Sequence, residues 1–130
     1  MIANGTFEVK MTGEPPYEVV DGVSLSRASF DKRFSGPLSG TSQVAMLAAR
    51  TKVADSAGYV ALERIVGQIE GKAGSFVVVH VGLMNHGAQS LTITIVPDSG
   101  TGELAGISGQ MTIRIEAGQH YYALDYTLAG

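Results

Sequence analysis

Apolar and polar residues alternate along most of this 130-residue chain, and this period of two constrains the fold more than any other feature. In the segment 89–96, Leu91, Ile93 and Ile95 alternate with Thr92 and Thr94. Successive side chains of a β-strand point to opposite faces, so this alternation predicts a strand with one buried face. Because similar segments follow one another along the chain, we expect an all-β protein.

The pattern predicts eight strands separated by Gly, Pro, Asp and Ser residues, which favour turns. The segment 43–50 contains good helix formers, and a short helix is the rival interpretation there. We favour a strand, because residues 39–42 give no convincing helix start and strands flank the segment. The expected strands are 5–12, 23–35, 38–52, 58–70, 75–84, 89–96, 109–116 and 120–128.

Short connections are expected between these strands. We expect a hairpin loop at 71–74, turns at 85–87 and 117–119, and a loop with at most a short extended piece at 17–21. Sequential strands joined in this way form a meander. Eight of them without a covering helix are best closed as an up-and-down antiparallel barrel, which removes exposed edges, and a sandwich is the second choice. The length fits one domain, 1–130.

Composition excludes several classes of function. The net charge is −3 and no basic run occurs, so a nucleic acid is not expected as a partner. The chain has no Cys, no metal-binding motif and no apolar run that could span a membrane, and we expect neither metal nor cofactor. The N-terminal residues lack a basic segment followed by an apolar core, which predicts a cytoplasmic protein.

A glycine-rich run at 100–105, Gly-Thr-Gly-Glu-Leu-Ala, matches the fingerprint of a dinucleotide-binding loop. Such a loop must open a helix whose N-terminal amides meet the phosphate. The following residues, 105–110, include two glycines and form a poor helix, and the next segment alternates with period two. We therefore interpret residues 97–110 as a turn-rich connection. An alternative function for it is a loop at the barrel mouth that presents Ser99 and Thr101 to a ligand.

Several segments resemble a small family of uncharacterised bacterial proteins, a domain-of-unknown-function family, over nearly the whole chain. The most specific are Leu62-Glu-Arg64 with Gly67, and the run 99–106. Members of that family look like allene oxide cyclase in fold, and the resemblance implies a closed eight-stranded antiparallel barrel. Allene oxide cyclase is a cofactor-free isomerase that acts on a fatty-acid epoxide. None of its site residues can be transferred to this chain, and fold alone does not give function.

Glu63 and His80 are the candidate catalytic residues. Glu63 lies within an apolar strand, where burial would raise the pKa of a carboxyl and suit it to acid–base chemistry. If His80 shares the inner face of the next strand, it approaches Glu63, and a His–Glu pair is a general-base arrangement. The alternatives are a buried ion pair of Glu63 with Arg27, Arg33 or Arg114, and a core histidine with a satisfied hydrogen bond.

Further candidates would bind a ligand without reacting with it. Aromatic side chains offer apolar area with a polar handle, although ordinary core packing is the favoured interpretation for them. The histidines at 86 and 120 are expected to be solvated because they lie in or beside turns. The ligand-binding candidates are Tyr59, Phe76, Tyr122 and Asp125, together with Ser99 and Thr101.

The two central strands, 58–70 and 75–84, are apolar on both faces. An apolar outer face must be covered, which predicts a homo-oligomer. For function, the sequence leaves three hypotheses: a barrel that binds a small hydrophobic or amphipathic molecule, a cofactor-independent isomerase or cyclase, and a filled barrel with a structural role. A cavity under about 300 Å³ would favour the filled barrel.

Overall fold

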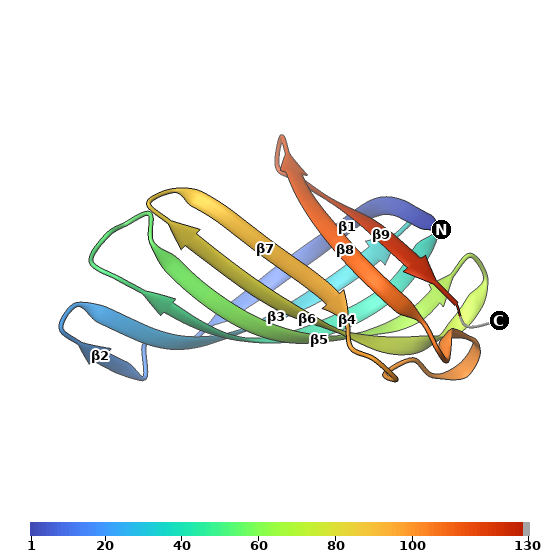
Figure 1. The fold of residues 1–130 in the computed structure, drawn as a ribbon, viewed down its shortest axis with the longest axis horizontal. Coiled ribbons are helices and arrows are strands. Elements are labelled where there is room, and N and C mark those ends of the chain that lie inside the picture. The colour runs from blue at the N-terminus through green and yellow to red at the C-terminus, as the bar shows by residue number, and fades with distance from the viewer. Residues whose placement is uncertain (129–130) are drawn as a thin grey trace.

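The computed structural model describes residues 1–128, and Figure 1 shows that long antiparallel strands make up nearly all of them. The segment 43–50 is strand, as the flanking pattern predicted, and the rival helix is absent there. The elements are β1 (Ile2–Gly13), β2 (Glu18–Val20), β3 (Val23–Ser35), β4 (Leu38–Arg50), β5 (Ala57–Ile69), β6 (Lys72–Asn85), β7 (Ala88–Ile95), the one-turn 3₁₀ helix η1 (Gly102–Leu104), β8 (Ser108–Glu116) and β9 (Gln119–Thr127).

The sheet closes on itself through β1. Strands β3 to β9 pair with their sequence neighbours, and β1 pairs with both β9 and β3. This makes the closed eight-stranded up-and-down barrel that the alternation predicted. The ninth strand, β2, is the short extended piece at 17–21, and it pairs only with the start of β3. The closure leaves little unpaired edge, which is the physical advantage of a barrel over an open sheet.

Four of the hairpins turn through two residues that both have positive φ. These residues are Asp21–Gly22, Glu70–Gly71, His86–Gly87 and Ala117–Gly118. Positive φ at both central positions is the type I′ geometry, whose twist matches that of the flanking strands. The expected four-residue loop at 71–74 was therefore wrong, because β6 begins at Lys72 and residues 70–71 alone make the turn.

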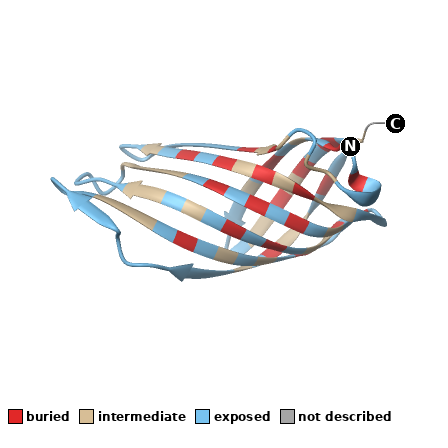
Figure 2. Cartoon of the chain, turned by 90° about the horizontal axis from the view of Figure 1, so that it is seen from below, coloured by how far each residue is buried: buried red, intermediate tan, exposed pale blue. Residues whose placement is uncertain are grey.

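The barrel is filled at one end and open at the other. At the closed end, Leu38, Ile69 and Tyr126 are buried, and so are Leu104 and Ile107 of the β7–β8 connection. Figure 2 shows buried and exposed residues alternating along the strands of the wall, with exposed residues predominating toward the β2 end. We call that end, where the β4–β5 and β6–β7 connections lie, the mouth.

The wall is incompletely paired between β7 and β8. Only two residue pairs join these strands, Ile93 with Met111 and Thr94 with Gln110. From there toward the mouth the two strands diverge, as Figure 1 shows. The side of the barrel is therefore open between Leu91 of β7 and Ile115 of β8. Among the residues that the structure describes, no helix has the length and apolar character needed to cross a membrane.

Candidate functional site

A polar cluster lies inside the barrel, between the packed closed end and the mouth. Glu63 on β5 and His80 on β6 point inward because each shares its face with buried residues of the same strand. Lys32 of β3 and Ser42 of β4 point to the same place from neighbouring strands. Four consecutive strands thus each supply one polar side chain to a single point.

Every partner in this cluster bonds to the Glu63 carboxylate. His80 Nε2 lies 2.7 Å from Oε1, and Lys32 Nζ lies 3.2 Å from the same oxygen. The Ser42 hydroxyl donates to Oε2 at 2.5 Å. Glu63 has no exposed surface, and the side chains of Lys32 and His80 are only 8% and 6% exposed. A buried carboxylate is tolerated only when it is paired and hydrogen-bonded, and here it is both.

The cluster keeps Glu63 ionised. Burial alone would raise the pKa of its carboxyl, but the hydrogen bond from His80, the charge of Lys32 and the hydrogen bond from Ser42 outweigh burial and lower that pKa. The sequence-based expectation of a raised pKa was therefore wrong, because it counted burial without these partners. The ammonium of Lys32 also lies 4.9 Å from the centre of the Phe7 ring, a cation–π distance.

The protonation of His80 follows from its partner. An ionised carboxylate can only accept hydrogen bonds, so the His80 Nε2 that contacts it carries a proton. In the neutral ring the other nitrogen, Nδ1, is then an unprotonated acceptor. Among residues 1–128, no group bonds to Nδ1, and no buried polar side-chain atom lacks a partner, so Nδ1 retains some accessible surface. In the neutral ring, the cluster therefore presents one acceptor nitrogen to which no residue of the described part bonds.

The mouth above the cluster is apolar and incompletely covered. Alternation directs Met11, Leu91 and Ile115 toward the inside of the barrel, on the same faces as Phe7, Ile93 and Met111. They are nevertheless 60%, 45% and 62% exposed, because the strands diverge there and nothing in the described chain packs over them. These three residues form an apolar rim at the opening.

A hollow of about 270 Å³ lies at the mouth, with Tyr59, Met84 and Leu91 among its lining residues. The Tyr59 ring lies against Gly82, where an added Cβ would clash with it, so a larger residue at that position would displace the ring. Burial raises the pKa of the Tyr59 hydroxyl. The volume lies just below the usual range of about 300–1,000 Å³ for ligand pockets. By the criterion set from the sequence, this volume favours a filled barrel over one with a large central cavity.

The glycine-rich connection lies at the closed end and not at the mouth. Its Ser99 hydroxyl accepts a hydrogen bond from the Val77 amide at 3.0 Å, and Thr101 Oγ1 accepts one from the Ser75 amide at 3.0 Å. These hydroxyls replace the missing β7 neighbour along the edge of β6. The turn-rich interpretation of 97–110 is confirmed, and the structure gives Ser99 and Thr101 structural contacts away from the apolar rim.

Three other ligand-binding candidates are also placed away from the mouth. Phe76 is completely buried in the core. The Tyr122 hydroxyl accepts a hydrogen bond from the Leu38 amide at 3.0 Å and donates to the Leu38 carbonyl at 2.9 Å, which fixes the β3–β4 turn. Asp125 is directed outward, 3.9 Å from the N-terminal ammonium. Of the predicted binding residues, only Tyr59 lines the hollow.

Sequence reasoning missed Lys32 and Ser42. It expected Arg27, Arg33 or Arg114 as the partner of Glu63, and this was wrong because all three lie on the outer faces of their strands. Lys32 shares its face with Ala28 and Phe34, and that alternation was the available signal for a buried lysine. No three His, Asp or Glu side chains of the described part gather as a metal site would require.

Comparisons with known proteins agree with this barrel. A family model described as "Protein of unknown function (DUF3224)" matches residues 3–126. A crystal structure of a protein of unknown function from the same family, from Shewanella oneidensis MR-1, is 45% identical with a TM-score of 0.94, and the match covers 100% of this chain and 98% of that one. No curated protein matches the sequence. The likeness to allene oxide cyclase stays a prediction.

Proposed function

Because this chain belongs to the DUF3224 family, whose function is unknown, we propose from its geometry that it binds one small hydrophobic or amphipathic molecule at the mouth of the barrel. The observation that carries this proposal is the exposed apolar rim of Met11, Leu91 and Ile115, whose side chains point inward. Water-exposed apolar surface at the opening of the barrel is favourable to cover, and a ligand would cover it.

The polar cluster gives the proposed ligand an orientation. A ligand whose apolar part lies on the rim has its inner end directed toward His80, where Nδ1 accepts a hydrogen bond. A hydroxyl is the simplest group that donates such a bond. The hollow of about 270 Å³ accommodates only part of a larger molecule, so a longer apolar tail would extend between β7 and β8. The cytoplasmic location expected from the sequence stays a prediction.

The binding test uses 1-anilinonaphthalene-8-sulfonate, whose fluorescence rises in apolar sites. Ile115→Arg places a charge on the rim, and we expect about tenfold weaker binding, which corresponds to about 1.4 kcal/mol. Ile2→Arg is the matched control, since Ile2 is 61% exposed, close to the 62% of Ile115, but points outward on β1. Equal effects of the two substitutions would contradict binding at the mouth.

A second candidate function is proton transfer, and the His80–Glu63 contact of 2.7 Å is the observation that favours it. Nδ1 of His80 is the nitrogen that would take a proton from a substrate bound at the mouth, while Nε2 stays bonded to the ionised Glu63. This chemistry is the cofactor-independent isomerase hypothesis of the sequence analysis. It requires a substrate, and mass spectrometry of molecules extracted from the purified protein is the way to identify one.

Turnover of such a molecule by His80→Asn then separates binding from catalysis. Loss of turnover with retained binding would support proton transfer. His120→Asn is the control, because His120 also lies inside the barrel and packs against Phe7 with ring centres 5.1 Å apart, yet is not part of the cluster. Unchanged turnover in His80→Asn would leave binding as the function.

A further inference from the structure

The outer wall formed by β3 to β6 carries an exposed apolar surface that the fold leaves uncovered. Leu47 of β4, Val60 and Leu62 of β5, and Val81 of β6 are each between 43% and 57% exposed. Their strands are the centre of the sheet, with neighbours on both sides, so this surface is a face and not an edge. A hollow of about 620 Å³ that includes Arg27, Val60 and Leu62 in its lining crosses it.

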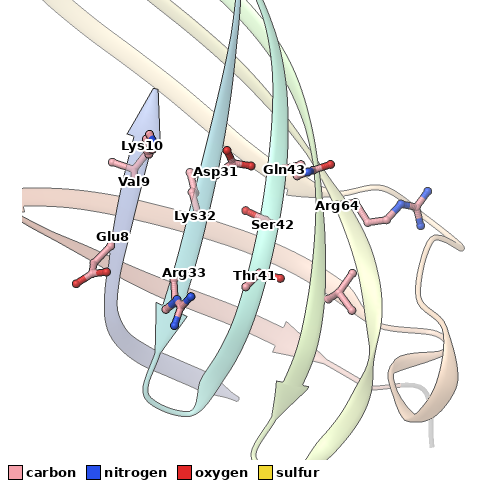
Figure 3. A pocket seen from close by; sticks show the side chains of 11 residues that line it. Glu8, Val9, Lys10, Asp31, Lys32, Arg33, Thr41, Ser42, Gln43 and Arg64 are labelled. Carbon is pink, nitrogen blue, oxygen red and sulfur yellow. The ribbon is translucent and has the colours of Figure 1, made fainter. Parts of the chain in front are cut away.

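Strand register arranges the side chains of this wall in three parallel rows. The central row is Thr12, Ser29, Ala45, Leu62 and Val79, read from β1 to β6, and it carries no charge. The row on the side of the mouth is Glu14, Arg27, Leu47, Val60 and Val81. The row on the side of the closed end is Lys10, Asp31, Gln43, Arg64 and Val77, and Figure 3 shows the first four across neighbouring strands.

The charges that the two outer rows carry at β1 and β3 are complementary, whereas Arg64 of β5 lies opposite an apolar residue. On β3, Arg27 lies in the row on the side of the mouth and Asp31 in the row on the side of the closed end. Beside them, the mouth row carries the negative Glu14 and the closed-end row carries the positive Lys10. Within residues 1–128, neither Arg27 nor Asp31 has a salt bridge, and the guanidinium of Arg27 is held 4.4 Å above the Tyr17 ring. Both charges are therefore available to a partner.

We propose that a second copy of this chain packs on this wall as a two-fold dimer. The two-fold axis lies in the interface, perpendicular to the strands and along the central row, so that each strand faces its own copy antiparallel. Leu62 then meets Leu62 of the partner subunit, and Val77 of one chain meets Val81 of the other. Each Arg27 faces an Asp31 and each Glu14 faces a Lys10 across the interface, four charge pairs in all. This interface is independent of the proposed ligand site, which lies inside the barrel.

The size and geometry of the wall suit such a dimer. The four strands β3 to β6, spaced by about 4.8 Å, over about eight residues of about 3.3 Å each, give about 500 Å² per chain, and Lys10 of β1 and the nearby Glu14 extend this area. Stable specific interfaces bury from about 600 Å² to 1,000 Å² on each partner. Sheets that pack face to face keep their strands within about 30° of alignment, an offset that long arginine and lysine side chains can span. A closed two-fold arrangement is also the commonest symmetry of homo-oligomers.

The first test is the mass in solution by light scattering at low micromolar concentration. We expect a dimer of about 27 kDa, twice the 13.6 kDa of one chain. Leu62→Arg, in the centre of the interface, is expected to give a folded monomer, whereas Ile2→Arg at the opposite end of β1, outside the three rows, leaves the dimer intact. A monomeric wild-type protein, an assembly of more than two chains, or a dimer that survives Leu62→Arg would overturn the proposal.

A charge exchange tests the antiparallel register itself. Asp31→Arg or Arg27→Asp alone places like charges opposite each other, and each is expected to weaken the dimer at least tenfold. The double variant R27D/D31R restores opposite charges with their positions exchanged, and we expect it to recover most of the lost affinity. Circular dichroism checks that each variant is folded. Failure of the double variant to recover would overturn this arrangement, even if the protein were dimeric.

Discussion

At the scale of single residues, Glu63 holds the buried polar cluster together. Its carboxylate is the common acceptor for Lys32, His80 and Ser42. Sequence reasoning identified Glu63 and His80 from alternation and strand order alone, and the predicted approach of these two side chains is present at 2.7 Å. The catalytic roles assigned to them stay predictions. Lys32 was missed because a long basic side chain is normally solvated, whereas here it lies over the Phe7 ring.

The Glu63→Gln substitution is expected to destabilise the protein by about 3 kcal/mol, because it leaves the Lys32 ammonium buried without a counter-charge. Urea unfolding followed by circular dichroism measures the difference. The double variant K32M/E63Q is the matched control: the methionine packs on Phe7 and Phe34, and the glutamine still bonds to His80 and Ser42. We expect it to recover part of the loss, and a double variant less stable than Glu63→Gln would contradict a charge-based explanation.

The lowered pKa of Glu63 predicts how the stability of the protein depends on pH. The pKa of Glu63 is lower in the folded protein than its ordinary value of 4.5, so the unfolded chain takes up the proton first. The contribution of Glu63 to stability is therefore complete well above pH 4.5 and is lost as the pH falls through the folded-state pKa. The stability difference between wild type and Glu63→Gln should shrink over that interval, and a constant difference from pH 7 to pH 3 would contradict this.

At the scale of elements, the alternating pattern located the eight long strands to within a few residues at most ends. The type I′ turns set the real boundaries, as at Glu70–Gly71, where the strands continue almost to the tip of the hairpin. Residues 97–110 form a turn-rich connection, as predicted from the lack of a helix-forming segment after the glycine run. Its three-residue turn, η1, and the burial of Leu104 and Ile107 were not predicted, because they depend on contacts with β6 and the barrel interior.

Thr101→Val tests how strongly the β7–β8 connection is attached to β6. The substitution removes the acceptor for the Ser75 amide and the contact with the Ser75 hydroxyl at 2.7 Å, and we expect a loss of about 1 kcal/mol in unfolding free energy. Thr112→Val on β8 is the control, since the Thr112 hydroxyl makes no hydrogen bond in the described part of the chain. Comparable losses in both variants would show that the connection needs no such attachment.

At the scale of the whole molecule, the pairing that closes the barrel is shortest between β7 and β8, which share only two residue pairs. We expect the amides of residues 88–92 to exchange with solvent at least about tenfold faster than those of 60–66 in β5, which has long neighbours on both sides. Hydrogen exchange followed by mass spectrometry of peptides measures the two rates. Equal protection of the two segments would contradict an opening on this side of the barrel.

The sequence by itself determined the strands, their inward faces and the barrel, because a period of two and short turns are local properties that a single chain displays. Only the tertiary structure decided which inward residues meet: that Lys32 and not an arginine pairs with Glu63, that Tyr122 fixes a turn, and that the rim at Ile115 stays open. These outcomes depend on strand register and on where the barrel wall diverges, and both are set by contacts between residues far apart in the chain.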